Sequence, residues 1–148
     1  MSRDPTFFPF VEFELVSRSI AASPIEACGL VLAPPCAVWP DDASTYRASQ
    51  TRNASPSPMR AFWIDPLEWI AQEDAAQTIG LAVHGFWHSH PRGSFRPSIA
   101  DLQMRERLGD GAPDWLFAIV GRDDCGAWQL AVHENENLRR HGRRALLG

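Results

Sequence analysis

The sequence contains no lysine, so all 14 of its basic residues are arginine, and 18 acidic residues give a formal net charge of −4. Nucleic-acid binding needs clustered positive charge to neutralise phosphates, and an acidic chain without a long basic stripe counts against that class of protein. The sequence also lacks any run of about 18 apolar residues and any secretory signal at its start. We therefore expect a soluble, cytoplasmic protein that does not associate with membranes.

Cysteine is scarce as well. The three cysteines, Cys28, Cys36 and Cys125, are odd in number, widely spaced and free of any Cys-x-x-Cys pair. This usage suits a reducing compartment, and each cysteine is expected to be a small buried hydrophobic residue. A length of 148 residues fits a single domain with a substantial core, covering residues 1–148.

Hydrophobic periodicity and turn residues predict helices alternating with strands, without an internal repeat. The expected helices cover 10–21, 66–78 and 98–108, although alternation in 10–15 also fits a strand. The expected strands cover 26–33, 36–39, 45–53, 61–64, 80–88, 114–121 and 127–133. This order indicates an α/β (α+β) fold in which one mixed sheet is flanked by helices.

Some side chains can be assigned to the core of that fold. The helix over 66–78, capped by Asp65 and opened by Pro66, is expected to bury Leu67, Ile70, Ala71 and Trp69. Five tryptophans in predicted elements are expected to be core residues, namely Trp63, Trp69, Trp87, Trp115 and Trp128. The segment 55–58, Ser-Pro-Ser-Pro, is expected to be a loop and not a domain linker, because too little chain lies on either side of it.

Three of the five histidines fall within seven positions, and two of them have metal-ligand spacing. Residues two apart in a strand point to the same face, so His88 and His90 can direct two imidazoles to one point. A helix that opens at Ser98 can place Asp101 in its first turn, facing the same spot. Two neutral histidines and one carboxylate leave a zinc ion with one open position, which is typical of a catalytic zinc site.

Each part of this pattern also has a simpler interpretation. His84 is expected to be a core histidine, and Ser98-x-x-Asp101 is also the pattern of a helix cap. Two histidines and a carboxylate can also hold iron. The combination of a strand-terminal His-x-His with an acidic residue on the next helix favours a bound metal.

The string from His88 to Asp101, His-x-His-x7-Ser-x2-Asp, resembles the signature of the JAMM (MPN+) metallopeptidases without departure in spacing. Glu26-Ala-Cys-Gly29 is similar to the upstream glutamate motif of the small prokaryotic members, which act on ubiquitin-like sulfur carriers. The resemblance runs from about residue 10 to residue 133. It implies an MPN/JAMM domain with a cytidine-deaminase-like core and leaves 134–148 as a basic C-terminal tail.

The resemblance also implies an activity and a set of roles. The protein would be a zinc peptidase or isopeptidase that hydrolyses the amide bond after the C-terminal Gly-Gly of a ubiquitin-like or sulfur-carrier protein. One zinc ion per chain would be held by His88, His90 and Asp101. Glu26 would be the general base, which favours zinc over iron, and Ser98 would donate a hydrogen bond to the oxyanion.

The partners follow less directly from the residues. Arg92 and Arg96, in the loop between the ligands, are candidates for binding a substrate carboxylate or acidic residues of the carrier. A Gly-Gly tail is expected to bind in an extended form, by adding to an edge of the sheet. The protein is expected to be a monomer or a weak homodimer.

Two alternative functions remain open. One is a catalytically inactive MPN scaffold or adaptor, although such proteins usually lose metal ligands and this chain has the full set. The other is a JAMM-type protein of DNA metabolism or phage assembly. The acidic charge balance counts against a role in DNA metabolism, and no fused second peptidase domain supports a role in phage assembly.

Overall fold

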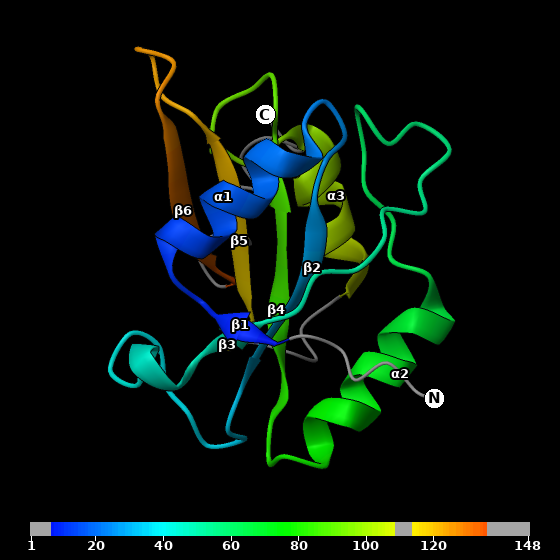
Figure 1. Ribbon diagram of the computed structural model, residues 1–148, viewed down its shortest axis with the longest axis vertical. Helices are drawn as coiled ribbons and strands as arrows, with labels where there is room; N and C mark the ends of the chain where they lie inside the picture. The colour runs from blue at the N-terminus through cyan, green and yellow to red at the C-terminus, as the bar shows by residue number, and fades with distance from the viewer. Residues whose placement is uncertain (1–6, 109–113, 136–148) are drawn as a thin grey trace.

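The computed structural model describes residues 7–108 and 114–135, which form a six-stranded mixed sheet with helices on both faces (Figure 1). The strands are β1 (Phe8–Pro9), β2 (Cys28–Ala33), β3 (Arg47–Ala48), β4 (Ala82–Ser89), β5 (Leu116–Arg122) and β6 (Trp128–Glu134). The helices are α1 (Glu12–Ala22), α2 (Pro66–Gln77) and α3 (Ile99–Leu108), with a short 3-10 helix η1 (Ala43–Thr45). The architecture confirms the predicted α+β class.

The strand order is β1-β3-β2-β4-β5-β6, and β4 and β5 are the one parallel pair in the described sheet. Parallel neighbours need a crossover connection, and α3 supplies it. The chain therefore leaves the end of β4, passes through a loop and enters α3. On the other side of β4, β2 runs antiparallel with Cys28 opposite His88. The start of β2 and the start of α3 both lie beside the end of β4.

Two apolar clusters fill the space on the two faces of the sheet. On the first face α1 packs its buried Leu15 against strand residues that include Trp87, which is fully buried. On the second face, Ala76 of α2 and Leu102 of α3 pack with Phe86. Figure 1 shows α1 in front of the sheet and α3 behind it. Because neighbours alternate along β4, Trp87 lies on the face opposite His88.

The helix α2 begins where the sequence predicts but buries a different face. Its cap is Asp65, whose side chain accepts a hydrogen bond from the Leu67 N–H. Leu67 is 78% exposed and Ile70 is 54% exposed, whereas Gln72 is buried. The prediction for this face was wrong because a polar contact orients the helix: Ser49 Oγ donates to the side-chain oxygen of Gln72 inside the core. Ala71 is exposed as well, and Trp69 is only partly buried.

Three predicted strands differ from the structure. Residues 36–39 form turns, 61–64 form a loop, and 45–53 contain only β3 and a single bridge at Thr51. Aromatic residues in these segments serve packing instead of pairing, as where Trp39 meets Tyr46 edge-on at 5.2 Å. Trp63 is 57% exposed, contrary to its prediction as a core residue.

Cysteine burial was also predicted too broadly, because only Cys28 is buried while Cys36 and Cys125 are exposed. Both exposed residues lie in turns, where the chain has no sheet or helix packed over it. No helix among residues 7–108 and 114–135 is long and apolar enough to cross a membrane. The predicted basic tail, with Arg139, Arg140, Arg143 and Arg144, lies outside the described residues apart from its first two positions.

Candidate metal centre

Three side chains that the sequence separates by up to 13 positions converge at the end of β4. The Nε2 atoms of His88 and His90 lie 3.0 Å apart. Asp101 places Oδ1 3.1 Å from Nε2 of His88 and Oδ2 3.1 Å from Nε2 of His90. The structure thus brings together the two histidines and the aspartate that the sequence selects.

The helix cap at the start of α3 orients the aspartate. The Asp101 N–H donates to Ser98 Oγ at 3.1 Å, and the Ser98 N–H donates to Asp101 Oδ2 at 2.9 Å. This reciprocal pair resembles a capping box, in which the side chains of the first and fourth residues satisfy each other's backbone donors. The carboxylate is therefore held toward the histidines by the same bonds that begin the helix.

The hydrogen-bonding chemistry of His90 fits a bound cation. Its Nδ1 lies 2.7 Å from the Ser94 carbonyl, which can only accept, so Nδ1 carries the hydrogen. In the neutral ring Nε2 then presents a lone pair, and this lone pair faces the carboxylate of Asp101. A tetrahedral zinc ion with ligand bonds of about 2.0–2.1 Å separates its ligand atoms by about 3.3 Å. Spacings of 3.0 and 3.1 Å among these atoms are close to that value.

The pKa shifts of His88 and Asp101 suit the same conclusion. Burial lowers the pKa of His88, which keeps this imidazole neutral. Burial also opposes the charged form of His90, but its bonds with Asp101 and Ser94 outweigh this and raise its pKa. Although burial opposes ionisation of Asp101, its close contacts with His88 and His90 hold its pKa well below the ordinary range. An ionised carboxylate and a neutral imidazole are the forms in which these residues bind metals.

The pairing of β2 with β4 positions Glu26 beside the two histidines. The Ala27 N–H donates to Ser89 Oγ at 2.8 Å, and the Ser89 N–H donates to the Ala27 carbonyl at 2.9 Å. Glu26 is 6% exposed, and its carboxyl lies with the ring nitrogens of His88 and His90 in a group that spans at most 4.8 Å. Burial raises its pKa to about 7. A carboxyl group with such a pKa can both accept and return a proton near neutrality.

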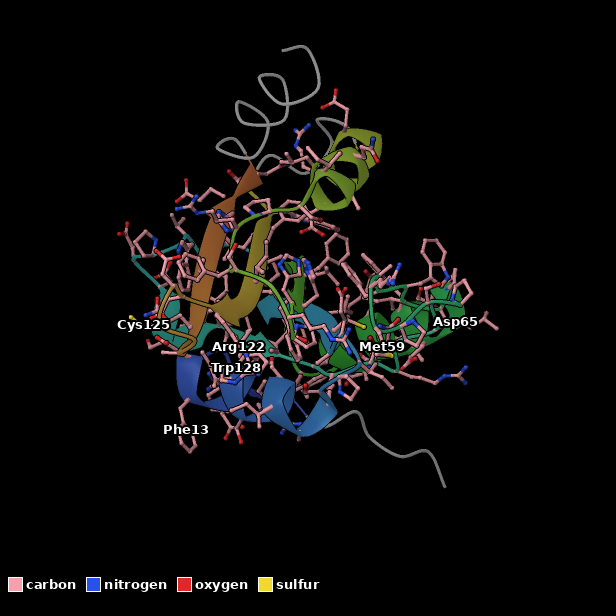
Figure 2. All side chains as sticks on the ribbon, turned by 90° about the horizontal axis from the view of Figure 1, so that it is seen from above. Phe13, Met59, Asp65, Arg122, Cys125 and Trp128 are labelled. Carbon is pink, nitrogen blue, oxygen red and sulfur yellow. The ribbon has the colours of Figure 1, made fainter. Side chains whose placement is uncertain are left out.

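A loop over residues 54–63 forms one wall of the site, and Asn53 holds it in place. The Asn53 amide donates to the carbonyls of Glu26 and Ala61, both at 2.9 Å, and accepts from the Trp63 N–H at 3.2 Å. Phe62 stacks on the His88 ring, with the ring centres 4.5 Å apart. Figure 2 shows this loop, marked by Met59, beside the start of α2. The sequence predicts a loop at 55–58 but contains no signal for the roles of Asn53 and Phe62.

The converging side chains line a cavity of about 310 Å³. Its described lining consists of Glu26, Arg60, Ala61, Phe62, His90, Gly93, Ser98, Ala100 and Asp101. Arg92 and Arg96 are exposed and do not belong to this lining, whereas Arg60, which the sequence does not single out, does. His84 lies elsewhere, where its Nε2 donates to the Pro34 carbonyl at 3.0 Å and its ring meets Tyr46.

Comparison with known proteins places this chain in a family. Residues 11–132 match the family described as prokaryotic homologues of the JAB domain. The chain is 32% identical over 94 residues to a Thermus thermophilus protein named as a probable TtuB-protein conjugate cleaving protease, which covers 63% of this chain and 59% of that protein. It is 31% identical over 112 residues to the desampylase of Haloferax volcanii, which covers 75% of this chain and 70% of that protein. The match to the Thermus protein therefore spans less than two thirds of its length.

Solved structures show the same fold. The protein DSY2949 of Desulfitobacterium hafniense superposes with a TM-score of 0.59 at 25% identity, over 82% of this chain and 84% of that one. A Salinibacter ruber protein superposes with a TM-score of 0.52 at 27% identity, over 81% of this chain and 74% of that one. The arrangement of strands and helices around the site therefore recurs in other proteins.

Proposed function

The chain belongs to the family of prokaryotic homologues of the JAB domain, and we propose that it is a zinc-dependent isopeptidase or peptidase that cleaves ubiquitin-like or sulfur-carrier proteins after their C-terminal Gly-Gly. One observation carries the proposal: the donor atoms of His88, His90 and Asp101 converge at 3.0–3.1 Å beside the carboxyl of Glu26. The relatives named for cleaving TtuB conjugates and for desampylation support the substrate class.

Each residue of the site has a separate task in this proposal. His88, His90 and Asp101 would hold the zinc ion, which when bound lowers the pKa of a water molecule to about 7 and polarises a carbonyl. Glu26 accepts a proton from the attacking water and returns it to the leaving amine. Ser98 donates its hydroxyl hydrogen to the substrate oxygen on which negative charge develops.

The size of the cavity supports a tail without side chains. A volume of about 310 Å³ stands at the small end of ligand sites, which range from about 300 to 1,000 Å³. Phe62 forms one side of the cavity. The smallest residues that line the cavity are Ala61, Gly93 and Ala100. Two glycines fit such a passage because their backbone carries no further bulk.

We propose a path for the tail other than addition to a sheet edge. The described sheet ends in β1 on one side and β6 on the other, whereas His88 lies in the interior strand β4 and His90 directly follows it. A strand added at either edge would therefore be separated from the site by other strands. We propose that the tail instead lies along the loop segment that contains Ala61 and Phe62.

The first test measures metal and activity in the same samples. We expect about one zinc ion per purified chain, and cleavage of a ubiquitin-like protein fused through Gly-Gly to a reporter. Asp101→Asn should lose both. The matched control is Asp123→Asn, which alters a carboxylate that accepts backbone N–H groups in the turn before β6, far along the chain from the ligands. Zinc-free protein, or cleavage that survives removal of zinc by a chelator, would contradict the proposal.

The second test concerns the tail. Fusions that end in Gly-Gly and in Ala-Ala should be compared at equal concentration, and the Ala-Ala tail should be cleaved at least tenfold more slowly. Equal rates would show that the passage does not select glycine. Zinc-loaded protein that leaves every Gly-Gly fusion intact would refute the proposed substrate while leaving the metal site in place.

A further inference from the structure

The loop between the two ligand-bearing elements lies directly against β5. The His90 N–H donates to the Val120 carbonyl at 2.7 Å, and the Arg122 N–H donates to the Gly93 carbonyl at 2.8 Å. Residues 90–93 therefore continue the pairing of β4 with β5 past the end of β4. Arg122, at the end of β5, is marked in Figure 2 near Trp128, over whose ring it lies.

Gly121 stands between the two β5 residues that make these bonds, and the chain has no room for a side chain there. A Cβ atom at this position would lie 2.4 Å from the Phe95 nitrogen and 2.6 Å from the Ser94 carbonyl oxygen. Both are backbone atoms, which cannot rotate aside as a flexible side chain would. Gly121 does not have a positive φ, so the glycine is required by the close approach of the loop and not by its own conformation.

The peptide that packs on Gly121 is the one that holds His90. The Ser94 carbonyl accepts the hydrogen of His90 Nδ1 at 2.7 Å, which fixes the tautomer and turns Nε2 toward Asp101. The absence of a Cβ at Gly121 therefore lets the loop descend far enough to make this bond. We propose that Gly121 is a positioning residue for the metal ligand His90, and this inference rests on the proposed function.

The size of the effect follows from the contact distances. An ordinary van der Waals contact begins at 3.4 Å, so an alanine at 121 must displace the peptide between Ser94 and Phe95 by about 1 Å from its 2.4 Å approach. A hydrogen bond of 2.7 Å does not survive such a displacement in good geometry. Loss of a partner that orients a metal-binding histidine typically weakens metal affinity by about 10- to 100-fold.

The test compares zinc affinity in two full-length variants by competition with a coloured chelator. Gly121→Ala should bind zinc about 10- to 100-fold more weakly than the unmodified protein. Gly126→Ala is the control for stability, because Gly126 has a φ of +81° in the turn before β6 and nothing within 4 Å of its Cβ position. This control should bind zinc as the unmodified protein does.

A spectroscopic measurement separates positioning from a general loss of structure. In the NMR spectrum of the zinc-loaded protein, the His90 Nδ1 hydrogen should be protected from exchange with water. Gly121→Ala should lose this protection and Gly126→Ala should keep it. If Gly121→Ala does not fold, Ser94→Gly replaces it, because this change loosens the same peptide while leaving its carbonyl in place.

The outcomes are distinct for the two proposals. A folded Gly121→Ala protein with unchanged zinc affinity and a protected His90 hydrogen would overturn the positioning role, as would unchanged values in Ser94→Gly where that variant is needed. Failure of the unmodified protein to bind zinc would refute the proposed function instead. The protection of the His90 Nδ1 hydrogen from exchange can then be compared in the metal-free proteins. Loss of this protection in Gly121→Ala would still support the positioning role.

Discussion

The raised pKa of Glu26 predicts an unusual pH dependence of stability in the zinc-free protein. Burial raises this pKa from its ordinary value of 4.5 to about 7, so the folded state binds a proton more tightly than the unfolded state. The stabilising contribution is fully present below pH 4.5 and is lost as the pH rises to about 7. At about 1.4 kcal/mol per pH unit, the loss across this window is at most about 3 kcal/mol.

Replacing the carboxyl with an amide removes this dependence. In Glu26→Gln the side chain keeps its shape and stays neutral, so the variant should gain stability relative to the unmodified protein as the pH rises. The free energy of unfolding should be measured by urea denaturation in the presence of a chelator, at several pH values from 4 to 8. The difference between the two proteins should increase by up to about 3 kcal/mol and then become constant above pH 7.

Two comparisons make the measurement decisive. Glu12→Gln, which alters an exposed glutamate on α1, corrects for effects common to any removed carboxylate. Saturating zinc should reduce the pH dependence of the unmodified protein, since a nearby cation stabilises the ionised carboxyl. A difference between Glu26→Gln and the unmodified protein that stays constant from pH 4 to 8 would refute the reasoning, because it would show that burial does not perturb this group.

The other predictions concern the neighbours of the site. Asn53→Asp keeps the acceptor for the Trp63 N–H but removes the donors to the Glu26 and Ala61 carbonyls. Trypsin should therefore cut at Arg60 faster, and KM should rise about tenfold with zinc content unchanged. An unaltered digestion rate would contradict the role of Asn53 in holding the loop. Ser98→Ala should lower the free energy of unfolding by about 1 kcal/mol and kcat by about 100- to 1,000-fold. Ser98→Thr keeps the hydroxyl and should retain most of the stability and most of kcat. Equal kcat in the two variants would show that the hydroxyl takes no part in the reaction. Asp65→Ala removes the acceptor of the Leu67 N–H and should cost about 1 kcal/mol in thermal or urea unfolding without changing zinc content. A loss of zinc in this variant would contradict the separation of α2 from the cluster of His88, His90 and Asp101.

The features that sequence could predict are those decided by neighbours along the chain. His88 and His90 alternate with Trp87, so strand geometry alone determines that the two imidazoles share a face and the indole takes the other. Asp65-Pro66 and Ser98-x-x-Asp101 mark helix starts through bonds that span at most three residues. Such local patterns predicted three helices and four of the strands close to their observed bounds.

The features that sequence could not predict depend on contacts between distant segments. The buried face of α2 is decided by the bond between Ser49 and Gln72, 23 positions apart. The wall of the cavity depends on Asn53 reaching Glu26, 27 positions earlier, and on Phe62 reaching His88. Nothing in the composition of the 54–63 loop distinguishes these contacts from those of any exposed loop rich in serine and proline.

The two sequence interpretations of Ser98 and Asp101, a helix cap and a metal site, turn out not to compete. The Ser98 N–H binds Asp101 Oδ2, and that same oxygen lies 3.1 Å from His90 Nε2. A carboxylate oxygen has more than one lone pair, so one oxygen can accept the backbone hydrogen and still face the histidine. The cap removes the rotational freedom that a metal ion would otherwise have to restrict. Since α3 begins at this point because of the cap, the start of the helix and the position of the Asp101 carboxylate are determined by one set of hydrogen bonds.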